Sequence, residues 1–176
     1  MSASSGSRVA APEAGSKRGR TAILDLPAPV LRPFCTLEVE VGTPRNLGDG
    51  RFGQRRIVPI VGGRVSGQSI SGTIVSGGAD WQTVGNGMTE MNARYAFETS
   101  DGALVEIIDT GYRHGPAEVM KQLASGQLVP PGEYYMRSSA RLETGHPDYA
   151  WLNRMIFVGT GARNGPTVQI DLYLVE

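Results

Sequence analysis

The side chains best suited to chemistry lie in one stretch of the sequence, residues 77–111. Within it Gly77 and Gly78 lead to Asp80 and Trp81, which place a carboxyl group beside the largest aromatic side chain. In a partly apolar cavity, burial raises the pKa of a carboxyl group toward neutrality, so the group can accept and return a proton. A structural interpretation is equally supported: Asp80 would fix a turn, and Trp81 would pack on the core.

Two predicted strands carry further charged and phenolic groups, each on one face. These faces consist of Asn92, Arg94 and Glu98 on one strand and Tyr135, Arg137, Arg141 and Glu143 on the other. A closed barrel could turn both faces inward, where they would form a shared site. The frequencies of charged side chains in proteins slightly favour the alternative, in which both faces are solvated and Arg and Glu pair across strands.

Each group has a role on the catalytic interpretation. The catalytic candidates are Asp80 and Glu143 as acid–base groups, Arg94 and Arg137 as stabilisers of an enolate or phenolate, and Tyr95 and Tyr135 as proton donors or relays. The candidates for contact with a substrate are Trp81, Asn92, Tyr112, Trp151 and Asn153.

Motifs for metals, nucleotides and nucleophilic catalysis are weak in this sequence. Residues 159–165 are rich in glycine, but no predicted helix follows them to bind a phosphate, so they are expected to form a hairpin. Neither His114 nor His146 has a partner at a diagnostic spacing, and Cys35 is in phase with an apolar strand face. We therefore expect no metal, no cofactor and no Ser-His-Asp triad.

Composition predicts one neutral, soluble domain. Lys plus Arg and Asp plus Glu both number 17, so no global field attracts nucleic acid or an anionic membrane. No apolar run approaches the ~20 residues that span a bilayer. The single cysteine suits a reducing compartment, and we expect a cytoplasmic protein. Residues 1–22 are predicted to be a disordered tail, and residues 23–176 to form the domain.

Turn signals divide that domain into short strands. Asn86-Gly87, Asp101-Gly102 and Asn164-Gly165 accept positive φ and therefore predict hairpins. Between the first two turns, one strand would have Met91, Ala93, Tyr95 and Phe97 on its apolar face. Further strands are expected at 35–41, 57–61, 69–75, 134–143, 151–159 and 167–175, with a loop at 42–53 and a helix at 116–125. This pattern favours an all-β fold, a single antiparallel β-barrel of about eight strands with one short helix, because a barrel leaves no strand edge exposed.

A series of short motifs resembles a known family. They are Arg55-Arg56-Ile57-Val58-Pro59-Ile60, Gly62-Gly63, Gly77-Gly78-Ala79-Asp80-Trp81, Ala93-Arg94-Tyr95, Asp101-Gly102-Ala103, Gly111-Tyr112-Arg113-His114-Gly115-Pro116, Glu133-Tyr134-Tyr135, Glu143-Thr144 and Trp151-Leu152-Asn153. In this order they resemble the domain-of-unknown-function family numbered thirty-two thirty-seven, over nearly all the chain after the tail. The resemblance implies a small antiparallel barrel like that of allene oxide cyclase, which is often paired as a homodimer, and an interior or mouth able to take a small organic ligand. The few members with roles are similar to cofactor-free cyclisation enzymes.

One residue departs from the family pattern. The family usually has Asp before Ala93-Arg94-Tyr95, whereas this chain has Asn92, which cannot act as a Brønsted base. If that carboxylate carries the family's chemistry, this chain has altered or lost it, and Asp80 and Glu143 are the remaining acid–base candidates.

Two functions from different classes follow. The first is a cofactor-independent lyase, isomerase or cyclase acting on a small phenolic, enone or lactone-like molecule. The second is a non-catalytic barrel that holds a small ligand, as lipocalin-like barrels do. A third interpretation makes the polar faces a dimer interface without a ligand. No nucleic acid or membrane partner is expected.

Overall fold

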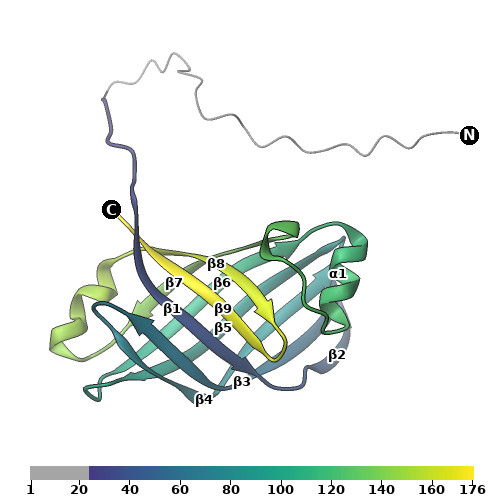
Figure 1. Cartoon of the computed structure of the whole chain (residues 1–176), viewed down its shortest axis with the longest axis horizontal. Helices are drawn as coiled ribbons and strands as arrows, with labels where there is room; N and C mark the ends of the chain where they lie inside the picture. The colour runs from purple at the N-terminus through teal and green to yellow at the C-terminus, as the bar shows by residue number, and fades with distance from the viewer. Residues whose placement is uncertain (1–23) are drawn as a thin grey trace, which may run out of the picture.

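The computed structural model describes residues 24–176, so the prediction of a disordered tail at 1–22 lies outside the described residues. The strands in this part of the chain are β1 (Leu31–Val41), β2 (Arg45–Gly50), β3 (Gly53–Gly67), β4 (Ser71–Gly85), β5 (Met88–Thr99), β6 (Leu104–His114), β7 (Tyr135–Glu143), β8 (Phe157–Asn164) and β9 (Thr167–Val175). They form one antiparallel sheet in the order β1-β9-β8-β7-β6-β5-β4-β3-β2, and β1 also pairs with β3 (Figure 1). This last pairing closes an eight-stranded barrel and leaves β2 as an extra strand, which confirms the predicted fold.

The predicted turns join neighbouring strands. Asn86 and Gly87 have φ values of 52° and 74°, as a two-residue hairpin between β4 and β5 requires. Gly102 and Gly165 also have positive φ, at 90° and 60°.

Bulges bend the two longest strands. The register between β3 and β4 shifts between Ile60 and Arg64, and the register between β4 and β5 shifts between Val75 and Ala79. Gly63 has a φ of 133° at the first bulge, where an added Cβ would lie 2.0 Å from the carbonyl oxygen of Glu38 in β1. These bulges let each strand continue around the barrel, so β3 and β4 extend well beyond the predicted spans 57–61 and 69–75.

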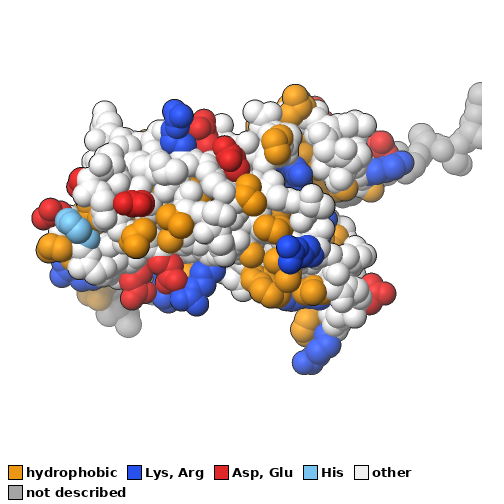
Figure 2. Space-filling model, turned by 90° about the horizontal axis from the view of Figure 1, so that it is seen from below, with side chains coloured by type: hydrophobic (Ala, Val, Ile, Leu, Met, Phe, Trp, Pro, Cys, Tyr) orange, Lys and Arg blue, Asp and Glu red, His pale blue; other side chains and the backbone are white. Residues whose placement is uncertain are grey.

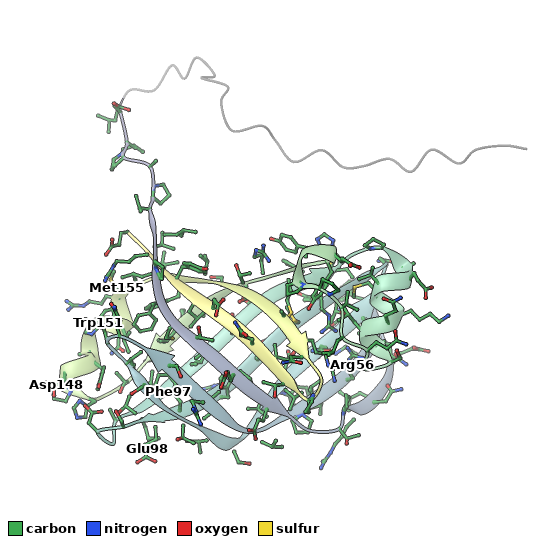
Figure 3. All side chains as sticks on the ribbon, in the orientation of Figure 1. Arg56, Phe97, Glu98, Asp148, Trp151 and Met155 are labelled. Atoms are coloured by element: carbon green, nitrogen blue, oxygen red, sulfur yellow. The ribbon has the colours of Figure 1, made fainter. Side chains whose placement is uncertain are left out.

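One half of the barrel is filled by apolar side chains. Phe97, Val105, Ile107 and Phe157 are fully buried in this core cluster. The end of the barrel in this half is covered by the 3₁₀ helix η2 (Pro147–Arg154), whose Leu152 is 0 % exposed. Figure 3 shows Trp151 and Met155 at this end and Arg56 toward the other.

The opposite end is covered by helix α1 (Ala117–Ala124), which matches the helix predicted at 116–125. Leu123 of α1 is 2 % exposed and belongs to a second, smaller apolar cluster with Met91 and Met136. The 3₁₀ helix η1 (Pro131–Glu133) precedes β7. No helix within residues 24–176 combines the length and the apolar character needed to cross a bilayer.

Two segments differ from the sequence expectation. Residues 42–53 were predicted to be loop, yet β2 lies there; every residue of β2 is exposed, so it has no apolar alternation to indicate a strand. Residues 151–159 were predicted to be one strand, but η2 continues to Arg154 and β8 begins at Phe157. Here the apolar residues serve to cover the barrel end rather than to line its wall.

The outer surface carries both charge signs. On the face shown in Figure 2, acidic and basic side chains lie beside one another, with small apolar groups between them.

Candidate functional site

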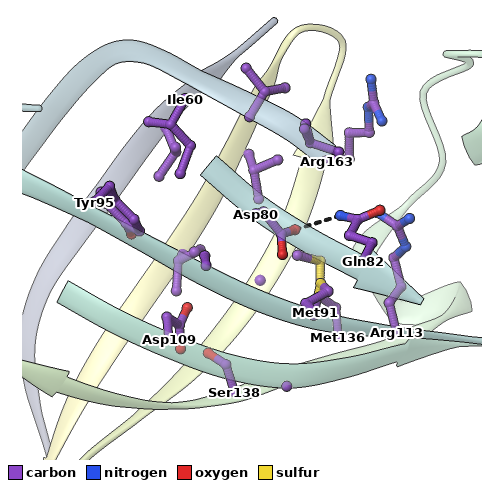
Figure 4. Close-up of a pocket in the computed structure, with 18 of the residues that line it drawn as sticks. Ile60, Asp80, Gln82, Met91, Tyr95, Asp109, Arg113, Met136, Ser138 and Arg163 are labelled. Carbon is purple, nitrogen blue, oxygen red and sulfur yellow. Dashed lines mark hydrogen bonds between the residues drawn. The ribbon is translucent and has the colours of Figure 1, made fainter. Parts of the chain in front are cut away.

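A cavity of ≈ 60 Å³ lies in the half of the barrel near α1. In this measure the volume corresponds to roughly four water molecules. All eight barrel strands contribute to its wall, for example Val39, Arg56, Asp80, Tyr95, Asp109, Ser138, Arg163 and Ile170. The strands therefore bring together residues that are far apart in the sequence (Figure 4).

Asp80 in β4 is held by hydrogen bonds on both carboxyl oxygens. The backbone N–H of Asn92 donates to its Oδ1 at 2.9 Å, and the Gln82 side-chain amide donates to its Oδ2. The Gln82 carbonyl in turn accepts a bond of 2.7 Å from Arg56 Nε. Burial raises the pKa of Asp80, while the bonds from Gln82 and Asn92 oppose that rise. Asp80 is thus a fixed acceptor in a network.

Asp109 in β6 is the less constrained carboxyl group. It is 6 % exposed, and its Oδ1 has no hydrogen-bond partner within the described chain. Burial raises the pKa of Asp109 from its ordinary 3.8 to about 7; the Ser138 hydroxyl opposes this rise, and the charge of Asp80 adds to it. At neutral pH such a group can both take and give a proton.

Tyr95 in β5 brings a phenol to the same space. The residue is 4 % exposed, and its hydroxyl also has no partner among the described residues. Burial, followed by the charge of Asp109, raises the pKa of Tyr95 well above its usual range, so the phenol stays protonated and can donate a hydrogen bond.

Three arginines, Arg56, Arg113 and Arg163, give the cavity its positive charge. Arg113 in β6 is 6 % exposed, and its Nε has no partner in the part of the chain described. Burial lowers the pKa of Arg113 to about 10, and the nearby charges of Arg56 and Arg163 add to that effect. Among residues 24–176, none of the three has a carboxylate oxygen within 4.0 Å of its side-chain nitrogens.

Several predicted catalytic residues lie outside this cavity. Arg94 is exposed and forms an ion pair with Glu106, with 2.7 Å between Nε and Oε1. The Glu143 side chain is 63 % exposed and lies 3.8 Å from the Arg141 guanidinium. Both point outward because their strand neighbours fill the core, so the solvated interpretation of these faces is correct and the shared inward site is wrong.

The outer face of β7 likewise removes two candidates from the cavity. Tyr135 is 44 % exposed, and the Arg137 guanidinium carbon lies 5.3 Å from the centre of its ring. Arg137 borders the cavity, but its guanidinium donates to the carbonyl oxygen of Met136. These contacts keep the phenol and the guanidinium on the outside of the barrel.

The residues predicted to contact substrate also lie elsewhere. Trp81 and Tyr112 are 45 % and 49 % exposed. Asn92 presents only its backbone N–H to Asp80, and its residue is exposed, so the replacement of the family's Asp at this position puts no change inside the cavity. Trp151 packs edge-on against Phe34 at the closed end, 5.8 Å between ring centres. Asn153 is bonded to the backbone of Thr144 through both side-chain atoms.

Sequence reasoning placed Asp80 and Tyr95 in the site and missed most of the rest. The missed groups are Arg56, Gln82, Asp109, Arg113 and Arg163. A signal was present: Asp109 and Arg113 fall in phase with the buried Val105 and Ile107. A charged residue in phase with the apolar face of a strand is the pattern that indicates an interior polar site.

Comparisons with known proteins agree with this architecture. A family model described as "Protein of unknown function (DUF3237)" matches residues 29–175. The chain belongs to this family. A UPF0311 protein of Rhodopseudomonas palustris is 43 % identical over 141 residues, covering 80 % of this chain and 92 % of that protein.

Solved structures extend the comparison. The crystal structure of a conserved protein of unknown function from Rhodopseudomonas palustris has a TM-score of 0.81 and 40 % identity with this DUF3237 protein, covering 86 % of this chain and all of the other. A β-barrel-like protein from Acinetobacter baumannii gives 0.76 and 41 %, covering 86 % and 99 % of the two chains. A structure described as an enzyme from Penicillium herquei gives 0.66 at 19 % identity, covering 88 % and 100 %, and shares the fold.

Proposed function

We propose that this DUF3237 protein is a cofactor-independent acid–base enzyme, a lyase, isomerase or cyclase for a small phenolic, enone or lactone-like molecule. The observation that carries the proposal is a pair of groups in one cavity, the Asp109 carboxyl oxygen and the Tyr95 hydroxyl, that have no hydrogen-bond partner among residues 24–176. Unsatisfied buried polar atoms cost about 1–3 kcal/mol each, which a protein retains where a ligand supplies the missing bonds.

Asp109 is the proton-transfer group in this proposal, in place of the Asp80 and Glu143 expected from the sequence. Its pKa of about 7 matches the working pH of a general base or acid. Asp80 positions the site by tying β4 to β5 and to Gln82. Glu143 has no part, because its side chain is largely exposed on the outer face.

A ring closure illustrates chemistry that these groups could perform. Asp109 removes the proton of a substrate hydroxyl, whose oxygen adds to the β-carbon of an enone. The electron pair of the carbon–carbon double bond forms a new double bond between the α-carbon and the carbonyl carbon. The carbonyl π pair moves to the oxygen, and Tyr95 donates a hydrogen bond to the resulting enolate. The proton on Asp109 then returns to the α-carbon. A C–O and a C–H bond form while an O–H bond and a C–C π bond break, so no oxidant, reductant or leaving group is required.

The comparisons support an enzyme only in general terms. One protein of this fold is described as an enzyme, so the architecture can accommodate catalysis.

The decisive experiment searches for a compound that the protein changes. Wild type and Asp109→Asn are incubated with small-molecule extracts from cells that express the genes adjacent to this protein's own gene. Mass spectrometry then compares the compounds present before and after incubation. We expect at least one compound to be converted by wild type, with a rate at least ~100-fold lower in D109N. Asp49→Asn on the exposed β2 is the matched control and should keep the full rate.

The competing function is a ligand-binding barrel without catalysis. It predicts compounds that co-purify with the protein unchanged. A compound that is retained but not altered, or one that D109N converts as fast as wild type does, would contradict the enzymatic proposal.

A further inference from the structure

The arginines of the cavity lie where it approaches a second hollow. That hollow, of ≈ 230 Å³, lies beneath α1 and is lined partly by Val84, Met88 and Met120. Arg56 and Arg113 line both spaces. Arg163 lines the inner cavity, and its Nε donates to the carbonyl oxygen of Gly165 at 3.0 Å.

Within residues 24–176, no ion pair balances the positive charge at this junction. The side-chain network offers one carboxylate, Asp80, whose two oxygens already accept bonds from Asn92 and Gln82. Only 6 % of the Arg113 surface is exposed, and its Nε has no hydrogen-bond partner among the described residues. A buried guanidinium is costly unless an anion pairs with it, and the planar fork of Arg fits a carboxylate or phenolate.

We infer that the ligand of this barrel is an organic anion whose charged group lies between Arg56, Arg113 and Arg163, with its apolar remainder beneath α1. This inference rests on the proposed function for the fate of the ligand, but not for its binding. It names the substrate class: an aromatic or enolic acid or phenolate that reaches Asp109 and Tyr95 with one end and the hollow under α1 with the other.

The positions of the other ionisable groups in the cavity are consistent with this assignment. Asp109 and Tyr95 lie further along the cavity wall, in β6 and β5, beyond Met91 and Gly111. An anion at the arginines would therefore leave the Asp109 oxygen free to act on a neighbouring atom of the same molecule. It would also supply the hydrogen-bond partner that Arg113 Nε does not find in the described part of the chain.

The first test compares an acid with its neutral counterpart. Salicylate and salicylamide are titrated into the full-length wild-type protein by isothermal calorimetry at pH 7. We expect salicylate to bind at least ~10-fold more tightly, and Arg113→Met and Arg163→Met each to abolish that preference. Arg94→Met, which removes an exposed arginine from the outer face, is the control and should leave the ratio unchanged.

The second test probes the hollow beneath α1. 3-Hydroxy-2-naphthoate, which adds an apolar ring to the same acid, should bind more tightly than salicylate. Met120→Asn, which makes the lining polar without adding a charge beside the arginines, should reduce this gain at least ~5-fold while leaving salicylate affinity within ~2-fold, because Met120 lines only the outer hollow. Circular dichroism and melting curves identify any variant that fails to fold, in which case Arg113→Gln, which also removes the charge, replaces Arg113→Met.

The outcomes separate this inference from the proposed function. Equal affinities for salicylate and salicylamide, or a preference that persists in both arginine variants, overturn the anion site even if Asp109-dependent turnover is found. A preference that depends on Arg113 and Arg163 supports the site even if no compound is converted, and the protein is then an anion-binding barrel.

Discussion

At the residue scale, burial of the Asp109 carboxyl group makes the stability of the protein depend on pH. Its carboxyl has an ordinary pKa of 3.8 and a folded pKa of about 7. Between these values the folded protein holds a proton that the unfolded chain has released. Stability therefore falls as pH rises through this window, by about 1.4 kcal/mol per pH unit for one fully titrating group.

Asp109→Asn removes that titration while keeping the size and shape of the side chain. We expect the variant to be more stable than wild type at pH 8 by a few kcal/mol, with the difference shrinking toward pH 4. Urea denaturation of both proteins at pH 5 and pH 8 measures the effect. If the free energy of unfolding has the same pH dependence in both, the assignment of the raised pKa to Asp109 is wrong.

The candidate site was predictable only in part, for a reason visible in single residues. Asp80 stood out because two glycines precede it and Trp81 follows it. Asp109 did not, because it stands between the apolar Ile108 and the polar Thr110, and these neighbours do not show which face of the strand is buried. Only the phase of Val105 and Ile107 reveals which face of β6 is buried, and a one-residue change of register would reverse every assignment.

At the element scale, the bulge in β3 controls closure of the barrel. Gly63 has a φ of 133°, and an added Cβ would lie 2.0 Å from the Glu38 carbonyl oxygen in the paired strand β1. Both features exclude a side chain without movement of the backbone.

Gly63→Ala should therefore destabilise the protein by about 3 kcal/mol, through backbone strain and separation of β1 from β3. Gly145→Ala is the matched control, because an added Cβ there meets nothing within 4 Å. Thermal melting of both variants checks the prediction, which fails if the two midpoints shift equally.

The strands were more predictable than the segments between them. Turn dipeptides such as Asn86-Gly87 and the apolar alternation of β1, β5 and β9 specify elements locally. β2 is specified by its pairing with β3, and η2 by the barrel end it covers, so neither has a local pattern of its own. Long-range contacts decide such elements, and a single sequence does not display them.

At the scale of the whole molecule, the barrel divides into a packed half and a polar half. Leu152 covers the packed end at 0 % exposure and belongs to the main core cluster, while the cavity lies at the other end. Damage to the packed end should therefore change stability without changing the site.

Leu152→Ala should lower the free energy of unfolding by about 2–5 kcal/mol, because it leaves a cavity in the core. Salicylate affinity should stay within ~2-fold at a temperature where the variant is folded. Leu128→Ala, at a position 72 % exposed, is the control for stability. A large loss of affinity in L152A would contradict the independence of the two halves.

The homodimer and the cytoplasmic location stay predictions. Both rest on the resemblance and on composition, and analytical ultracentrifugation would check the first.

The extra strand β2 has one further consequence. β3 pairs with β2 from Gly53 to Ile57 and with β1 from Ile60 to Gly67, so the hairpin of β2 and β3 extends past the circumference that eight strands close. Phe52 at its tip is 74 % exposed. Because the tip is not part of the closed wall, its loop can be lengthened or replaced without changing the barrel's diameter. A reporter peptide could be attached at this tip. Natural variation in the same loop could reshape the barrel rim for ligands of different length.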